Sequence, residues 1–360
     1  MANKISVIMP VYNCERYLEA ALASVLSQTG VEIEVIAVED CSPDHSREIL
    51  QKAAARDARI RPIYNEVNRG VAAVRNLALD AVTGEYVAFC DSDDIVPSGA
   101  YEALLSVMGE GDVAVGEFED AFFDDLTDGN LEAAELHSCS IRAEDTQTSF
   151  GCLFSVCCLW TKLMRVSFLR EHGLRFDESM SIGEDVVFLA SLATKSPTCH
   201  TVHRSVYWHC HHNVASYRSL THTHHLAAFQ KHVECRQKLL DICRDIPECR
   251  DYVYLRFSAD VVRNLHLISS AEEKREAFAL FRAFLAGYDF ENKPRFFRAL
   301  TGVPYAQFVT MDADSYFEYC RTLTPRERVE AEFDCGMIGF RWILRYFACW
   351  LRYKLKKENR

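Results

Sequence analysis

Short apolar runs alternate with segments of helical periodicity over the first hundred residues. Four runs fit buried strands because they are short and rich in β-branched or aromatic residues: 5–9, 34–40, 60–64 and 85–89. The segments between them fit helices: 13–28, one that begins at 42, and 70–82. Strands that alternate with helices over short connections predict an α/β fold, with a mostly parallel sheet flanked by helices.

Capping residues and prolines set the expected ends of these elements. Pro10 is expected to end the first strand, and Asn13 to cap the first helix. Ser42 and Pro43 fit the N-cap and the first helical position of the second helix. In such sheets ligands bind at the carboxyl ends of the strands, so the residues that follow each run are candidates for a site.

The remaining two thirds of the chain change in character twice. Residues 117–145 hold ten acids and one base, Arg142, and we expect a solvated, partly irregular excursion there. Beyond about residue 218 the pattern is helical, with few strand signals. We therefore expect three parts: an α/β domain over 1–217, a helical region over 218–335 and a basic amphipathic helix over 336–360.

The last of these parts is basic in a chain that is acidic elsewhere. One helical stripe carries the bases Arg341, Arg345, Arg352 and Lys356, and aromatic and aliphatic residues fill most of the remainder. A helix of this kind suits an anionic membrane surface. The alternative is a terminal helix that packs on the helical region and leaves its basic stripe in water.

Composition narrows the partners and the compartment. The formal net charge of −12 argues against nucleic acid as the main partner, because phosphate backbones are bound by a net basic face. The 15 cysteines are odd in number and scattered without a CxxC pair, which predicts reduced thiols in the cytosol. The sequence has no signal-peptide pattern and no spanning run of about 18 apolar residues. We expect a cytoplasmic protein, peripheral on the inner face of the cytoplasmic membrane.

Three carboxylates crowd into the stretch FCDSDD, residues 89–94, directly after the fourth predicted strand. Because side chains alternate along a strand, Asp91 and Asp93 can point to the same side. Oxygen ligands of this kind suit Mg²⁺ or Mn²⁺, which usually complete their shell with substrate phosphates. The alternative role, capping the helix that follows, needs only one side chain and fits Asp94 best.

Further acids stand at the ends of two other elements. Asp40 follows the second strand, where it could cap a helix, bind a ribose or accept the N3–H of a uracil. Glu184 and Asp185 open a helix, where the dipole stabilises carboxylates whatever their chemical role. No GxGxxG follows the first strand and no GKS or GKT occurs, which disfavours dinucleotide-binding and P-loop proteins.

Histidines gather in the stretch CHTVHRSVYWHCHHN, residues 199–213. His209 and His211 alternate on a predicted strand, so both could face one side. A structural zinc is conceivable, but the spacing lacks the paired motifs of such sites. The alternative is that these are ordinary surface or strand histidines.

Ordered motifs in the first half resemble those of family 2 glycosyltransferases, which have the GT-A fold. The resembling stretches are ISVIMPVYNCERYLEAALASVLSQT (5–29), EVIAVEDCSPDHSREIL (34–50), NRGVAAVRNLAL (68–79), GEYVAFCDSDD (84–94) and GEDVVFLASL (183–192). The resemblance extends over roughly residues 4–215, and the helical remainder carries no part of it. It implies an inverting enzyme with a nucleotide-sugar donor, most often UDP-linked.

The resemblance also implies a set of donor-binding residues at the strand ends and in the loop before the third helix. These are Pro10, Val11, Tyr12, Asp40, Asn68, Arg69, Arg75, Asp91 and Ser92. Within this set, residues 10–12 would wall the nucleobase and Asp40 would accept a hydrogen bond from it. Asp91 would lie near the ribose or a metal-bound water.

Metal binding and catalysis fall on other residues of the same motifs. Asp93 would hold Mn²⁺ or Mg²⁺, with Asp91 and His211 as further ligands. Asp185 would act as the general base on an acceptor hydroxyl, beside Glu184. Where many relatives place an arginine after a YWH-like stretch, this chain has Cys210 and then two histidines, so His211 or His212 would have to replace that cation.

The implied function is sugar transfer to a glycan or lipid-linked acceptor in cell-surface polysaccharide synthesis. One alternative is a sugar-nucleotide nucleotidyltransferase, which should carry a Gly-rich loop after the first strand. That place reads PVYNCERYL, without glycine. Another alternative is a non-catalytic nucleotide-sugar-binding or scaffold protein at the membrane, which would bind nucleotide-sugars without hydrolysing them.

Truncation before Phe340 should release the protein from anionic liposomes, because the cut removes the basic amphipathic helix. Co-sedimentation with vesicles that contain an anionic phospholipid measures this, and neutral vesicles are the control. If the truncated chain still binds anionic vesicles as the full chain does, the tail is not the anchor.

Overall fold

The computed structural model describes residues 4–123, 139–141, 148–212, 225–257, 259–292, 294–301 and 303–322. The described residues form two compact units, one that holds those up to 212 and one that holds those from 225 on. Most of the acidic excursion after residue 123 and the whole predicted helix at 336–360 lie outside the described residues. Every helix in the described part of the chain is too short or too polar to cross a membrane.

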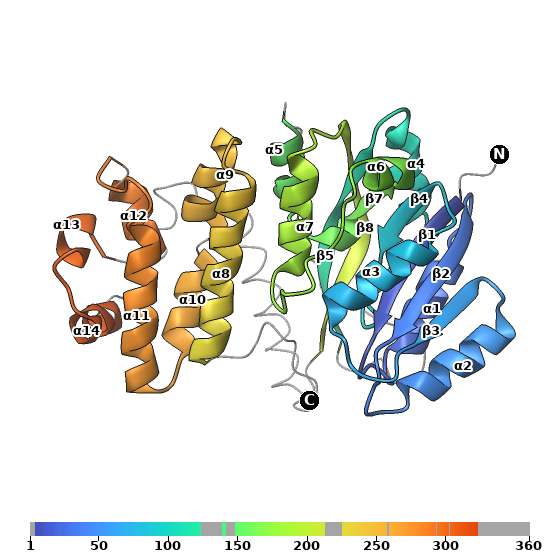
Figure 1. Ribbon diagram of the computed structural model, residues 1–360, viewed down its shortest axis with the longest axis horizontal. Helices are drawn as coiled ribbons and strands as arrows, with labels where there is room; N and C mark the ends of the chain where they lie inside the picture. Colours follow the sequence, from blue (N-terminus) through green and yellow to red (C-terminus); the bar gives the residue numbers. More distant parts are fainter. Residues whose placement is uncertain are drawn as a thin grey trace, which may run out of the picture. The chain divides into compact units, whose positions relative to one another are not determined.

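The first unit is built on one eight-stranded sheet (Figure 1). Its strands are β1 (Lys4–Val11), β2 (Glu32–Glu39), β3 (Ile60–Tyr64), β4 (Tyr86–Phe89), β5 (Val113–Phe123), β6 (Cys139–Ile141), β7 (Lys162–Arg165) and β8 (Cys199–His212). The order is β3-β2-β1-β4-β7-β5-β6, and β8 pairs with β5. The pairs among β1, β2, β3 and β4 are parallel, as is β5 with β8, whereas β7 is antiparallel to β4 and β5.

Helices cover this sheet as the alternating pattern predicts. They are α1 (Leu18–Leu26), α2 (Ser46–Arg56), α3 (Val71–Ala81), α4 (Ala100–Met108), α5 (Ser149–Ser155), α6 (Val166–Glu171) and α7 (Glu184–Ala193). The central strand β1 is buried on both faces, and α3 packs across β1 and β2 (Figure 1). The predicted α/β class is therefore confirmed, and the carboxyl ends of β1, β2 and β4 lie at one edge of the sheet.

Three predicted element ends are wrong. Pro10 does not end β1, which continues to Val11. Val11 O accepts from Asp40 N, so the main chain of Val11 faces β2 and that of Pro10 faces the side of β4. The pairing of β1 with β4 ends at Ile8, so the N–H that Pro10 lacks costs no hydrogen bond of the sheet. Asn13 has a φ of 53° and caps nothing, since α1 begins only at Leu18.

The second helix also starts later than predicted, at Ser46 rather than after Ser42. Ser42 Oγ instead accepts from Asn13 N at 3.2 Å, and Asp44 Oδ2 accepts from Glu15 N at 2.9 Å. The loops after β1 and β2 are thus joined side by side. Capping preference alone could not predict this, because the partners are about 30 residues apart.

The second half of the sheet was largely missed by the sequence patterns. The first residues of the acidic excursion belong to β5, which continues to Phe123 between β7 and β8. Strand β8 contains the predicted strand at His209 and His211 and begins ten residues earlier, at Cys199. Both strands carry charged or polar residues, so neither is a continuous apolar run.

The described part of the second unit is helical, as predicted. Its elements are α8 (Leu226–Ile242), α9 (Pro247–Asp251), a π-helical stretch (Tyr252–Phe257), α10 (Ala259–Leu267), α11 (Ala271–Leu285), α12 (Pro294–Thr301), α13 (Tyr305–Phe308) and α14 (Ala313–Thr322). Aromatic rings fill its interior, where Phe278, Phe308 and Tyr316 contact one another. The division of the chain near residue 217 and the boundary near 335 stay predictions.

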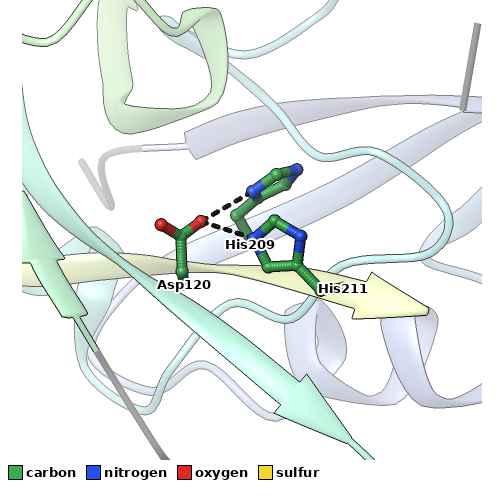
Figure 2. Close-up of side chains that lie close together, drawn as sticks. All are labelled: Asp120, His209 and His211. Atoms are coloured by element: carbon green, nitrogen blue, oxygen red, sulfur yellow. Dashed lines mark hydrogen bonds and ion pairs between the residues drawn. The ribbon is translucent and has the colours of Figure 1, made fainter. Parts of the chain in front are cut away.

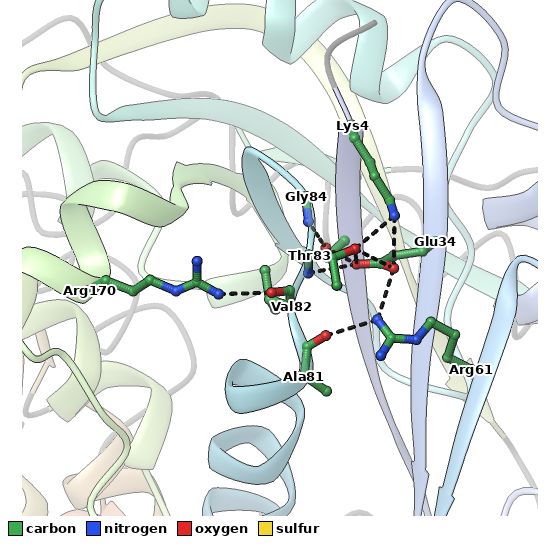
Figure 3. Close-up of polar contacts among 9 residues, drawn as sticks. Lys4, Glu34, Arg61, Ala81, Val82, Thr83, Gly84 and Arg170 are labelled. Atoms are coloured by element: carbon green, nitrogen blue, oxygen red, sulfur yellow. Dashed lines mark hydrogen bonds and ion pairs between the residues drawn. The ribbon is translucent and has the colours of Figure 1, made fainter.

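A buried carboxylate ties the sheet together at the edge opposite the carboxyl ends (Figure 3). Glu34 is 4% exposed and accepts from Ser6, from Thr83 and from Lys4 and Arg61, both at 3.0 Å. Burial alone would raise the pKa of Glu34, but the hydrogen bonds from Ser6 and Thr83 lower it to about 2.

The turn beside this carboxylate needs a glycine. A Cβ on Gly84 would stand 2.7 Å from Lys4 O and 2.8 Å from Ser6 Oγ, which leaves no room for a side chain. Gly84 N also donates to Ser6 Oγ at 2.9 Å. The start of β4 is therefore fixed against β1 by backbone approach, and this sets where β4 ends at the other edge.

The variant Glu34→Gln should be less stable than the parent at pH 7, by up to about 3 kcal/mol. Since the pKa of Glu34 is lowered on folding, its contribution is present above the ordinary glutamate value near 4.5 and is lost as the pH falls toward 2. Urea unfolding of both proteins at pH 7 and pH 3.5 measures this. The exposed Glu48→Gln is the control, and a difference that does not shrink at low pH would contradict the role of Glu34.

Candidate active site

The carboxyl ends of β1 and β2 form one wall of a site. Val11 is the last residue of β1, and Tyr12, which follows it, is 49% exposed, which is unusual for a large aromatic residue among those that the structure describes. The left-handed backbone of Asn13 and Cys41, with φ of 53° and 57°, turns both strand ends sharply. Tyr12 is therefore exposed to solvent beside the ends of these two strands.

Asp40 is buried and holds the loop before α3. It is 3% exposed and accepts from Asn65 Nδ2 at 2.7 Å and from the backbone N–H groups of Arg69 and Gly70, both at 2.9 Å. Asn68 and Arg69 themselves are exposed, and Asn68 Nδ2 donates to Asp40 O at 3.3 Å. The carboxylate thus holds the two residues that lead into α3, a different helix from the one that follows Asp40 in sequence.

Residues 91–94, which follow Cys90 at the end of β4, differ in burial. Asp91 and Asp93 are partly exposed at the carboxyl edge, whereas Ser92 and Asp94 are buried. The Ser92 hydroxyl lies within hydrogen-bonding reach of the buried Cys14 thiol. We therefore expect Ser92 to contact a nucleotide-sugar through its main chain.

Asp94 does not cap a helix, which corrects the alternative reading of this residue. Its Oδ1 accepts from Cys210 N at 2.7 Å and its Oδ2 from the Tyr207 hydroxyl at 2.8 Å, and both donors belong to β8. The Tyr207 oxygen in turn accepts from Asp91 N at 3.0 Å. Burial, with the adjacent carboxylate of Asp93, raises the pKa of Asp94 well above its usual value. Asp94 and Tyr207 thereby fix the backbone that presents Asp91 and Asp93.

Arg75 links this segment to the start of α7. It lies on α3 and is 5% exposed; Nη2 donates to Asp91 Oδ1 at 3.1 Å and Nη1 to Glu184 Oε1 at 2.6 Å. Burial alone would lower the pKa of Arg75, but the charges of Asp91 and Glu184 raise it above its usual value. Arg75 is thus part of the framework of the site, and its guanidinium faces carboxylates of the protein.

Asp185 stands beside this ion pair at the N-terminus of α7. Gly183, with a φ of 77°, turns the chain into the helix, and Asp185 Oδ1 accepts from Val186 N at 2.8 Å. Burial and then the charge of Glu184 raise the pKa of Asp185 to about 7, although Arg75 acts in the opposite direction. A carboxylate with this pKa is suited to exchange protons near neutral pH.

A segment that sequence reasoning missed lies near Asp185. The ionisation of Asp185 is affected by Cys157, and that of Cys158 by Asp185, so residues 157–158 lie close to the carboxylate. Lys162 anchors this segment, since its buried Nζ donates to Val156 O and to Cys158 O. A buried lysine that binds only main-chain and hydroxyl oxygens has no pattern in the sequence that would reveal it.

The histidines of β8 face an acid on β5 (Figure 2). Asp120 Oδ1 lies 2.9 Å from His209 Nδ1 and 2.8 Å from His211 Nε2. Burial alone would lower the pKa of His209, but its hydrogen bond to Asp120 and the charge of Asp94 raise it to about 9. The structure therefore brings His211 together with Asp120 and His209, and its predicted role as a ligand beside Asp93 stays a prediction.

Asp120 and Tyr207 could not be assigned from the sequence. Asp120 lies opposite His209 in the parallel register of β5 and β8, and Tyr207 reaches the carboxyl end of β4 from β8. Both placements depend on which strands are neighbours. The only local signal was the alternation of His209 and His211.

Comparison with known proteins relates most of the first unit to one family. Residues 6–173 match the sequence model described as Glycosyl transferase family 2. A Bacillus subtilis (strain 168) protein, the uncharacterized glycosyltransferase EpsJ, is 31% identical over 198 residues, which cover 52% of this chain and 55% of EpsJ. The putative teichuronic acid biosynthesis glycosyltransferase TuaG of the same organism is 45% identical over 106 residues, which cover 29% of this chain and 42% of TuaG. The matches thus span about half the length of these relatives.

A solved structure shows the same fold. Staphylococcus aureus TarS 1-349, crystallised in complex with UDP-GlcNAc, superposes with a TM-score of 0.63 at 19% identity, over 89% of this chain and 91% of that one. The family match includes the carboxylates after β2 and β4, whereas α7 lies beyond its last residue. Residues 6–173, most of the first unit, thus have the sequence of a family 2 glycosyltransferase domain, and the unit has the GT-A fold.

Proposed function

We propose that the chain is an inverting glycosyltransferase that moves a sugar from a nucleotide-sugar to an acceptor hydroxyl. The observation that carries the proposal is that one buried guanidinium, that of Arg75, binds both the segment that would hold the donor and the segment that would supply the base. Arg75 binds Asp91, at the place for the donor, and Glu184, whose neighbour Asp185 has a pKa of about 7. Such a transfer requires a base that can take up a proton near neutral pH, and carboxylates nearby that can bind a metal ion.

The donor is a UDP-sugar in this proposal. Support comes from TarS, which has been crystallised with UDP-GlcNAc and with UDP. The exposed Tyr12, which follows Pro10 and Val11 at the end of β1, would offer its ring as a stacking surface for a nucleobase. Asp40 would recognise the base at the rim of the loop that it holds, and Asn68 and Arg69 would reach the nucleotide from the same loop.

A divalent cation, Mg²⁺ or Mn²⁺, fits the residues at the end of β4. Asp91 and Asp93 are partly exposed carboxylates at the carboxyl edge, and hard oxygen ligands are what these ions prefer. Asp93 would be the main ligand and Asp91 the second one. When bound, the cation would neutralise charge on the diphosphate leaving group.

The chemical step rests on Asp185. Its carboxylate takes the proton of the acceptor hydroxyl as the hydroxyl oxygen forms a bond to the anomeric carbon of the donor. The bond from that carbon to the diphosphate breaks, and the nucleoside diphosphate leaves with the electron pair. One base and one direct displacement give inversion, so no second carboxylate nucleophile is needed. Glu184 keeps Arg75 in place and helps to raise the pKa of Asp185.

The acceptor is a hydroxyl of a glycan or of a lipid-linked saccharide in cell-envelope polysaccharide synthesis. The names of two relatives in Bacillus subtilis, TuaG and the minor teichoic acid biosynthesis protein GgaB, support this class. A cytoplasmic location, with residues 336–360 against an anionic membrane surface, would suit such an acceptor.

Two substitutions should separate donor binding from chemistry. Asp93→Ala should weaken Mn²⁺-dependent binding of UDP at least about tenfold, because it removes the main cation ligand. Asp185→Asn should leave that binding unchanged. It should slow the release of UDP from the UDP-sugar that the parent uses by about 10²- to 10⁴-fold, because it removes the base. Calorimetric titration with UDP and Mn²⁺, and UDP release from a panel of UDP-sugars, measure the two effects.

The pH profile supplies a further check on the same variants. Turnover by the parent should fall as the pH drops through about 7, since Asp185 must be ionised to accept a proton. The exposed Asp80→Asn, on α3, is the control and should match the parent in both assays. Equal loss of UDP binding in the two site variants would refute the division of roles, and full UDP binding without turnover in the parent would indicate a binding protein.

A further inference from the structure

We propose that Asp120, His209 and His211 form a second metal site, for a borderline-soft divalent ion such as Zn²⁺, separate from the cation of the donor. His209 and His211 point to the same side of β8, and Asp120 stands opposite His209 on β5 (Figure 2). One ligand atom from each of the three lies within 4.8 Å of the others. The site joins two neighbouring strands of the same unit.

The set of donor atoms selects the class of ion. Two imidazoles and one carboxylate suit zinc and related transition metals, whereas Mg²⁺ prefers oxygen ligands. This distinguishes the cluster from Asp91 and Asp93, which offer oxygen alone. Three protein ligands leave a fourth position of a tetrahedral shell for water or another small ligand.

The observed spacing needs only a small adjustment. With metal bonds of about 2.0–2.1 Å, two ligands of a tetrahedral ion stand about 3.3 Å apart. Asp120 Oδ1 is now 2.9 Å from His209 Nδ1 and 2.8 Å from His211 Nε2. A rotation of the side chains that opens each distance by about half an ångström would admit the ion. Protons now shared with Asp120 would leave to solvent as the imidazole lone pairs bind the metal.

The surroundings favour a cation and fix the ligands. Asp120 is 7% exposed, while the side chains of His209 and His211 are 41% and 31% exposed, which leaves a path for an ion from solvent. The ring of Trp160 stacks on His209 with centroids 5.8 Å apart and so restricts its orientation. The carboxylates of Asp93 and Asp94 act on His209 as well, which adds negative charge near the site.

Metal at this place would stiffen the support of the donor carboxylates. Strand β8 supplies Tyr207 and Cys210 N to Asp94, and an ion would tie that part of β8 to β5. The assignment gives His211 a role apart from the donor cation. In the absence of metal, Asp120 simply accepts hydrogen bonds from both imidazoles, and the experiment must distinguish these two states.

Metal-free full-length protein should be titrated with Co²⁺ without nucleotide, with absorption spectra recorded at each step. We expect one equivalent to bind with weak visible bands of nitrogen and oxygen ligation. Intense near-ultraviolet bands would instead indicate binding to cysteine thiolates and would overturn the proposal. Zn²⁺ should displace the Co²⁺ and raise the midpoint of thermal unfolding relative to protein in EDTA.

Variants then locate the bound ion. His209→Ala, His211→Ala and Asp120→Asn should each weaken Co²⁺ binding at least tenfold, and circular dichroism in EDTA tests whether each still folds. His203→Ala is a matched control, because His203 pairs with Glu117 across the same two strands at 3.2 Å and is not one of the three clustered residues. It should bind Co²⁺ as the parent does, and Asp93→Ala should keep most of that binding, because it retains all three ligands and loses only a neighbouring charge. Unchanged binding in folded ligand variants, or no binding by the parent, would overturn the proposal.

Discussion

A buried guanidinium between two carboxylates is the interaction on which the site depends. Arg75 is almost fully enclosed, and its two terminal nitrogens bind Asp91 and Glu184. These partners lie 16 and 109 positions away from Arg75 in the sequence. Burying charges is costly, and a buried pair that loses one partner typically costs 3–5 kcal/mol, because the other charge stays without compensation. The end of β4, the start of α7 and the middle of α3 are therefore held in one arrangement.

Two independent supports meet at the residues after β4. Arg75 holds the side chain of Asp91, while Tyr207 and Asp94 hold the backbone from the side of β8. Asp93 lies between these supports, at the edge where a cation and a diphosphate would bind. The same arrangement sets the chemistry of Asp185, since burial beside Glu184 raises its pKa to about 7. Position and proton affinity thus follow from one network.

The sequence predicted the first half of the sheet because its strands are continuous apolar runs and its helices have a regular apolar face. It failed where long-range contacts overrode local preference. The loop at Asn13 binds the loop at Ser42, and this contact delays both helices that capping residues seemed to start. Strands β5 and β8 carry charged residues that pair with one another across the two strands, as Asp120 does with His209.

The same distinction applies to the site. Asp91, Asp93, Glu184 and Asp185 were recognisable because they follow a strand or open a helix in motifs of known order. Arg75 was placed near the nucleotide, but its contacts with Asp91 and Glu184 depend on tertiary structure. Tyr207, Lys162 and Asp120 carry no local signal at all, because each acts on a segment distant in sequence.

A double-mutant cycle between Arg75 and Glu184 tests the central claim most directly. The cycle compares kcat/KM for sugar transfer in the parent, Arg75→Met, Glu184→Gln and the double variant, each shown by circular dichroism to be folded. If one buried network holds the donor carboxylate and the base, each single change should lower kcat/KM at least tenfold, and the double variant should be little worse than the poorer single one. Losses that simply multiply would contradict it.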